Sequence, residues 1–243
     1  MEVKTALLTA GVSACSFRLL NTLMKYLPVP EPERRKVWMW RNTFTSLVHS
    51  SLTGTWAVLC FYQNPRMAED LISSNSLFSH ALISVSTGYF VYDLLDMALN
   101  QRLSQSWEML LHHSMVISCF SLPLLTRLYV GFAVVSLLVE VNSVFLHTRQ
   151  LLRLARGRDA AGSPPVAYRV TVLLNLGTFA VFRVCTLGWM TRWFSRQSGG
   201  LPRFTLMLGS LGLGLTTIMN TLLLYRLLRS DLLSNTRKAD CDQ

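Results

Sequence analysis

The residues in this sequence best suited to chemistry are two adjacent histidines, His112 and His113. They lie inside the apolar segment 107–125, WEMLLHHSMVISCFSLPLL. Ionisable side chains within membrane-spanning helices are rare and usually functional, because hydrocarbon does not solvate them. An imidazole can act as a general base, or as a nucleophile that accepts an acyl group. We therefore predict that this pair is the centre of an intramembrane site.

Carboxylates occur at a similar depth in and beside this segment. Asp93 and Asp96 are three residues apart, so a helix places them on one face. We expect Asp96, nearer the end of its segment, to be solvated. Glu108 precedes His112 by one helical turn and can contact it. At 1.5 Å per residue, His112 is about 8 Å inside the segment.

Two later segments add polar residues near this level. Glu140 lies about 10 Å from the end of its predicted helix, and Asn142 is slightly nearer that end. Arg183 lies near the middle of segment 170–193 and is a candidate counter-charge for Glu140. We expect a polar pocket that opens towards the cytosol and has apolar walls for an acyl chain. The alternative is structural: the same groups pair with one another and fix helix packing.

These residues receive predicted roles. If the protein is an enzyme, His112 and His113 are its catalytic residues. The predicted substrate-binding residues are Asp93, Glu108, Glu140, Asn142 and Arg183. We predict no metal site and no cofactor. One HH pair cannot supply the several histidine boxes of a membrane di-iron enzyme, and the sequence has no CxxC, HExxH, P-loop, GxSxG or dinucleotide motif.

The composition is that of a polytopic membrane protein. Hydrophobic residues make up 51% of the 243 residues and charged residues 15%, and the mean hydropathy is +0.34. Soluble domains carry about 25% charged residues. The net charge of +10 does not indicate nucleic-acid binding, because the basic residues lie in short loops between apolar segments.

Seven segments are apolar and close to the roughly 20 residues that a spanning helix needs. They are 5–27, 43–62, 77–99, 107–125, 128–147, 170–193 and 204–228. We interpret the first as a retained helix and not as a cleaved signal peptide, because its apolar pattern continues past Arg18 without a small-residue cleavage site. The fold predicted is an all-α membrane protein with about seven transmembrane helices.

The loops divide into a strongly basic set and a weakly basic set. Fifteen Lys and Arg residues fall on one side, in or beside the loops after the first, third and fifth segments and after the last. Six fall on the other side. Because basic loops favour the cytosol, we predict an N-terminus outside and a C-terminus in the cytosol.

Three stretches of sequence resemble the TLC family, which includes ceramide synthases, translocating-chain-associating membrane proteins and smaller TLC proteins. They are residues 46–59 (SLVHSSLTGTWAVL), residues 88–113 with the pattern GYFxxDxxD followed by WxxxLHH, and residues 129–149 (YVGFAVVSLLVEVNSVFLHTR). The resemblance covers roughly 35–230. It implies an N-terminal helix and basic link (1–34), a six-helix TLC domain around a central cavity (35–230), and a short cytosolic tail (231–243).

The resemblance also implies a role in lipid metabolism. The small TLC proteins that this chain looks most like lie in the plasma membrane, limit polyunsaturated acyl chains in phospholipids, and promote membrane rigidity. In ceramide synthases the paired histidines carry acyl transfer from acyl-CoA, a role that would map onto His112 and His113. Those enzymes place a His-Asp-x-x-Asp run on the next helix, where this chain has Glu140-x-Asn142.

We therefore predict a regulator of phospholipid composition and membrane fluidity. The expected partners are membrane lipids and fatty acyl chains, with no nucleic acid. The main alternative is an acyl-CoA-dependent acyltransferase that uses the histidine pair, with acyl-CoA as its substrate. A third hypothesis is a scaffold for another membrane protein. The expected location is the plasma membrane, and the alternative is the endoplasmic reticulum.

Overall fold

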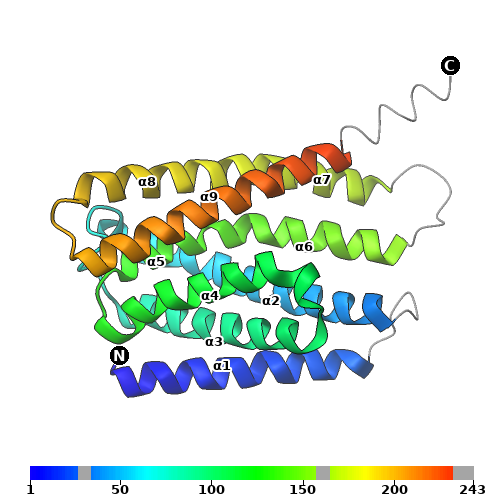
Figure 1. The fold of residues 1–243 in the computed structure, drawn as a ribbon, viewed down its shortest axis with the longest axis horizontal. Helices are drawn as coiled ribbons and strands as arrows, with labels where there is room; N and C mark the ends of the chain where they lie inside the picture. Colours follow the sequence, from blue (N-terminus) through cyan, green and yellow to red (C-terminus); the bar gives the residue numbers. More distant parts are fainter. Residues whose placement is uncertain (27–33, 157–164, 232–243) are drawn as a thin grey trace.

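The apolar segments fold as helices, because only intrasegment hydrogen bonds satisfy a backbone surrounded by lipid. The computed structural model describes residues 1–26, 34–156 and 165–231, and within these ranges it contains no strand (Figure 1). The α-helices are α1 (Val3–Leu23), α2 (Arg34–Gln63), α3 (Leu77–Asn100), α4 (Leu103–Thr126), α5 (Val130–Leu137), α6 (Val139–Arg156), α7 (Val166–Phe179), α8 (Thr186–Gln197) and α9 (Arg203–Asp231). Shorter helical elements are η1 (Met24–Tyr26), η2 (Pro65–Ala68) and the π-helical η3 (Ala180–Cys185). Most of the predicted basic link and cytosolic tail lies outside the described residues.

Six helical stretches in the described ranges are long and apolar enough to cross a membrane. They are Val3–Tyr26, Leu77–Asn100, Ser106–Thr126, Val130–Ala155, Val166–Gln197 and Arg203–Ser230. The predicted second span lies in α2, which has 30 residues and is thus also long enough to cross. One face of α2 is polar and buried, which lowers its hydropathy; its buried residues include Thr45, Ser46, His49, Ser50 and Thr53. The prediction of an all-α polytopic membrane protein with about seven spans is confirmed.

Successive spans run in alternating directions, so their ends gather at two ends of the bundle (Figure 1). The N-terminus lies at one end, together with the connections 64–76, 127–129 and 198–202. The connection between α3 and α4 lies at the other end, with the C-terminal ends of α6 and α9. This arrangement separates the loops into the two sets from which the topology was predicted. The cytosolic assignment of the second end stays a prediction.

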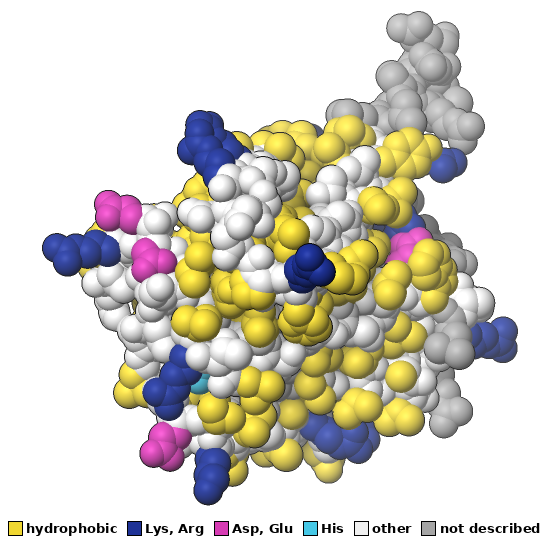
Figure 2. Space-filling model, turned by 60° about the vertical axis from the view of Figure 1, so that its left-hand side comes forward, with side chains coloured by type: hydrophobic (Ala, Val, Ile, Leu, Met, Phe, Trp, Pro, Cys, Tyr) yellow, Lys and Arg dark blue, Asp and Glu magenta, His cyan; other side chains and the backbone are white. Residues whose placement is uncertain are grey.

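The surface is suited to a lipid environment. Hydrophobic side chains cover much of the face shown in Figure 2, and charged side chains lie mostly towards its edges. Large apolar side chains such as Leu173 and Phe204 are 71% and 68% exposed. In a soluble protein such a surface would favour aggregation, whereas in a bilayer it contacts acyl chains.

Two of the spans are not continuous α-helices. The predicted span 128–147 divides at Leu138, where α5 ends and α6 begins. The predicted span 170–193 contains the π-helical turn η3, which carries Arg183. A π-helical turn inserts an extra residue into the helix and changes which side chains face the bundle, and such turns are frequent at functional sites.

Candidate functional site

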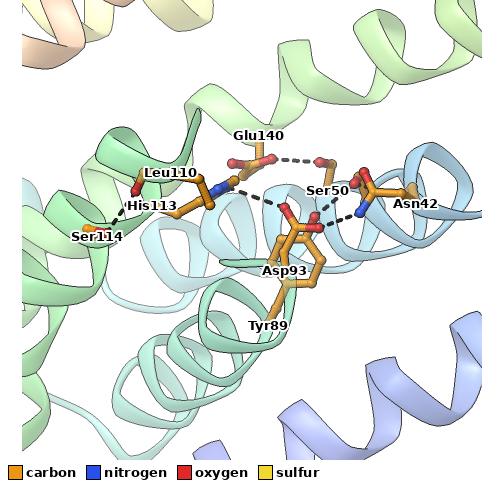
Figure 3. Close-up of polar contacts among 9 residues, drawn as sticks. Asn42, Ser50, Tyr89, Asp93, Leu110, His113, Ser114 and Glu140 are labelled. Atoms are coloured by element: carbon orange, nitrogen blue, oxygen red, sulfur yellow. Dashed lines mark hydrogen bonds and ion pairs between the residues drawn. The ribbon is translucent and has the colours of Figure 1, made fainter. Parts of the chain in front are cut away.

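A buried carboxylate–imidazole pair joins α3 to α4. Asp93 Oδ2 lies 3.6 Å from His113 Nε2, and both side chains are about 95% buried (Figure 3). The other carboxylate oxygen of Asp93 accepts a hydrogen bond of 2.6 Å from Asn42 Nδ2 of α2. Because a buried carboxylate needs polar partners, the hydrogen bond from Asn42 holds Asp93 in place, and the His113 imidazole lies close enough to interact with it electrostatically. A histidine oriented by a carboxylate is suited to proton transfer.

His112 lies on a different face of α4 from His113 and borders a cavity of about 150 Å³ that is partly open at the surface of the bundle. The cavity lies among α4, α5, α6, α8 and α9, and most of its wall is apolar. Wall residues include Val116, Phe120, Phe132, Met190, Trp193 and Leu208. A cavity with mostly apolar walls and a few polar groups is suited to an apolar ligand that has a polar end. The two predicted histidines thus have different surroundings: His113 lies beside the Asp93 carboxyl group, and His112 lies in the cavity wall.

Glu140 also borders this cavity. Its Oε2 accepts a hydrogen bond of 2.6 Å from Ser50 Oγ of α2 (Figure 3). The two helices approach closely here because Gly54 has no side chain: a Cβ at this position would lie 3.0 Å from the backbone nitrogen of Val141 and 3.2 Å from the carbonyl carbon of Glu140. The glycine therefore allows α2 to support Glu140 at the cavity.

Asn142 and Arg183 belong to a polar network that reaches the cavity wall at Asn220. Arg183 donates from Nε to Asn142 Oδ1 at 2.6 Å, from Nη2 to Ser143 Oγ at 2.9 Å, and from Nη1 to Asn220 Oδ1 at 2.8 Å. The amide nitrogen of Asn142 in turn donates to the Asn175 side chain at 3.0 Å. Arg183 lies near enough to Glu140 to interact with it electrostatically, as the sequence suggested, but its hydrogen bonds go elsewhere.

Glu108 lies apart from the other predicted site residues. Its two carboxylate oxygens accept hydrogen bonds of 2.9 and 2.8 Å from Arg226 Nη2 of α9. The predicted contact of Glu108 with His112 is thus replaced by a bond to a residue 118 positions away. The pair is open to solvent, because the Arg226 side chain is 61% exposed. A substrate-binding role for Glu108 stays a prediction.

We expect Glu108→Gln to lower the free energy of unfolding by less than about 1 kcal/mol, because exposed ion pairs contribute little. Thermal unfolding of the purified protein in detergent micelles measures the change. Arg226→Gln should have an effect of the same small size, since it removes the other partner. A loss of several kcal/mol in either variant would show that the pair does more than join two exposed helix surfaces.

The structure adds site residues that the sequence analysis did not identify. Asn42 and Ser50 support the two carboxylates from α2, and Tyr89 donates a hydrogen bond of 2.9 Å to Ser46. A signal for them exists, since polar residues at 42, 46, 49, 50 and 53 share one helical face. Asp96, expected to be solvated, is only 8% exposed and accepts a hydrogen bond from Trp38 Nε1 at 3.0 Å.

Among the described residues, no group of three or more His, Cys, Asp or Glu side chains is placed to hold a metal ion. What the arrangement offers is an imidazole–carboxylate pair beside an apolar cavity whose wall carries a second imidazole and a carboxyl group. These groups can transfer a proton or contact the polar end of an otherwise apolar ligand.

Comparison with known protein families matches residues 39–229 to the TLC domain. The chain belongs to the TLC domain family. The predicted family is thus confirmed, and the Asp93–His113 pair, the cavity and Arg183 all lie within the TLC domain, which α1 precedes. No solved structure matches the chain.

The sequences of similar proteins align with nearly the whole chain. TLC domain-containing protein 2 of zebrafish (Danio rerio) is 52% identical over 240 residues, which are 99% of this chain and 96% of the zebrafish protein. The human protein of that name is 42% identical, with 95% of this chain and 86% of its own length covered. TLC domain-containing protein 1 of rat is 31% identical, with 89% and 86% covered. This chain is therefore a multi-pass membrane protein with a TLC domain.

Proposed function

We propose that this protein regulates the acyl composition of membrane phospholipids, limits the incorporation of polyunsaturated chains, and so promotes membrane rigidity. The observation that carries the proposal is the apolar cavity inside the TLC domain, with His112 and Glu140 in its wall. An acyl chain that enters from the bilayer exchanges one apolar surrounding for another, so its binding depends on how well it packs against the cavity wall. The polar wall residues would contact the chain's polar end.

A cavity with fixed walls can distinguish acyl chains by shape. Aromatic side chains form part of its wall, among them Phe90, Phe132 and Trp193. Cis double bonds bend a chain, and a bent chain in a closely packed cavity loses contacts or forces the walls to move. We therefore expect the site to select between saturated and polyunsaturated chains.

A second candidate function is acyl transfer from acyl-CoA, and the Asp93–His113 pair favours it. In such a reaction an imidazole would take the proton from an acceptor hydroxyl or amine while the acceptor attacks the thioester carbonyl, and the CoA thiol would leave. His112 in the cavity wall is placed nearer a bound acyl group, and His113 is oriented by Asp93. For either function we propose the plasma membrane as location, with the basic end of the bundle in the cytosol.

We expect cells that lack this protein to accumulate polyunsaturated phospholipids, and wild-type protein to reverse the change. The double variant His112→Ala/His113→Ala at matched abundance should fail to do so, because it removes the cavity imidazole and the partner of Asp93. Quantitative phospholipid profiling measures the result. Unchanged profiles in cells without the protein would contradict the proposed function.

His147→Ala is the matched control, because His147 is a half-buried imidazole of α6 that does not border the cavity. It should restore the profile as the wild type does. Full rescue by the His112/His113 double variant would make the pair structural and would exclude the acyltransferase. If that variant fails, turnover of acyl-CoA by purified protein distinguishes an enzyme from a lipid-binding regulator.

A further inference from the structure

One cavity residue, Asn220 of α9, has an unsatisfied hydrogen-bond donor. Its side chain is only 8% exposed and borders the cavity. Its amide nitrogen, Nδ2, is buried and has no hydrogen-bond partner among the described residues. Leaving a buried donor unpaired destabilises a protein by about 1–3 kcal/mol, so most such groups find a partner.

The orientation of this amide is set by Arg183. A guanidinium group only donates hydrogen bonds, so the atom of Asn220 that it contacts must be the oxygen. Arg183 Nη1 donates to Asn220 Oδ1 at 2.8 Å. The nitrogen is therefore the atom left without a partner, and rotating the amide by 180° would place two donors against each other.

Other buried asparagines of the bundle do not share this feature. Asn142 donates from Nδ2 to Asn175 and Thr178, and Asn21 donates to the Tyr92 hydroxyl. Asn220 is thus a residue of the cavity wall whose amide nitrogen has no partner, and the group that would satisfy it is a hydrogen-bond acceptor. An acyl group has one such acceptor, its carbonyl oxygen, at the end of an apolar chain.

We propose that Asn220 Nδ2 donates a hydrogen bond to the carbonyl oxygen of an acyl group in the cavity and so fixes the position of the chain. The inference rests on the proposed function, in which the cavity holds an acyl chain. Arg183 acts through Asn220 as a positioning residue. The carbonyl can belong to a fatty acid, an acyl-CoA thioester or a phospholipid ester, because all three present the same acceptor.

The test uses photo-crosslinking of the purified full-length protein. Four probes carry a diazirine on a 16-carbon chain: the free fatty acid, its CoA thioester, a phosphatidylcholine that contains it, and a hydrocarbon without a carbonyl. Labelling at increasing probe concentration gives apparent affinities, and mass spectrometry identifies labelled peptides from the cavity wall. Comparison among the three carbonyl probes shows which source of the acyl group is bound.

Asn220→Asp is the decisive variant, because it retains an oxygen for Arg183 and replaces the donor with an acceptor. In the wild type we expect at least one carbonyl probe to bind about tenfold more tightly than the hydrocarbon, as one buried hydrogen bond allows. Asn220→Asp should remove that preference while hydrocarbon labelling stays unchanged. Asn21→Asp makes the same chemical change in a buried site away from the cavity and should keep the preference.

The possible failures can be told apart. Cavity labelling without a carbonyl preference in the wild type, or with the preference intact in Asn220→Asp, would overturn the role of Asn220 and leave acyl binding in place. Absence of cavity labelling by every probe would overturn acyl binding itself.

If Asn220→Asp also loses hydrocarbon labelling, the substitution has disturbed the cavity itself, and the hydrogen bond is then tested in the wild-type protein. The infrared band of a ¹³C-labelled carbonyl probe should lie at lower frequency when bound than in hydrocarbon solvent. An unshifted band would overturn the hydrogen bond.

Discussion

Arg183→Leu is expected to lower the free energy of unfolding by about 2–5 kcal/mol. Arg183 donates hydrogen bonds to Asn142, Ser143 and Asn220, which connect its own segment to α6 and α9. Hydrogen bonds between membrane helices contribute about 0.6 kcal/mol on average and up to about 1.7 kcal/mol. Leucine fills a similar space but donates nothing, so three acceptors inside the bundle lose their partner at once.

Arg192→Leu is the matched control, because Arg192 lies in the same span and is exposed. The same substitution there removes one positive charge without breaking the network, and it should change the stability by less than about 0.5 kcal/mol. Thermal unfolding in detergent micelles measures both variants. Equal stabilities for the two variants would show that the network around Arg183 does not hold the helices together.

Arg183→Leu should also affect the cavity. Without the guanidinium, nothing forces the Asn220 amide to keep its oxygen on the Arg183 side. The preference for carbonyl probes over the hydrocarbon should therefore fall, although Asn220 itself is unchanged. A variant that unfolds more easily but keeps the full preference would show that Asn220 is oriented by other contacts.

Much of the fold follows from simple patterns in the sequence. A run of about 20 apolar residues has to be helical in lipid, and the alternation of basic and less basic loops favours an odd number of passes. The break at Leu138 and the π-helical turn at Ala180–Cys185 do not appear in hydropathy, because they change the direction of side chains and not their polarity. Glu140 follows the break at Leu138 directly, and Arg183 lies within the π-helical turn, so these two irregularities determine the directions of both side chains.

The candidate site could be predicted as a set of residues but not as a set of contacts. Depth along each helix depends on residue number alone, so a layer of carboxylates and imidazoles could be foreseen. The contact partner of each side chain depends on how its helix is rotated about its own axis, and that rotation is determined by the packing of the helices. Asp93 thus pairs with His113, Glu108 with Arg226, and His112 faces the cavity. Asn220 was missed because one amide in an apolar helix is a weak signal.

Gly88→Ala is expected to destabilise the bundle by about 1–3 kcal/mol, as adding a methyl group to a closely packed interior usually does. Gly88 lies in α3 where α1 crosses it. A Cβ at this position would overlap the Ala10 carbonyl oxygen and would lie 2.7 Å from Ser13 Cβ. The backbone of α1 would have to move away, which would stretch the hydrogen bond of 2.7 Å from Ser13 Oγ to the Val85 carbonyl.

The same substitution at Gly177 should have the opposite sign. Gly177 lies inside α7, and a Cβ there would meet nothing within 4 Å. Alanine is favoured over glycine in a helix by up to about 1 kcal/mol, so Gly177→Ala should stabilise the protein slightly. Because both variants gain the same helix propensity, the difference between their melting temperatures isolates the contact between α1 and α3. Equal melting temperatures would mean that α1 is not held against the TLC domain as closely as the structure shows.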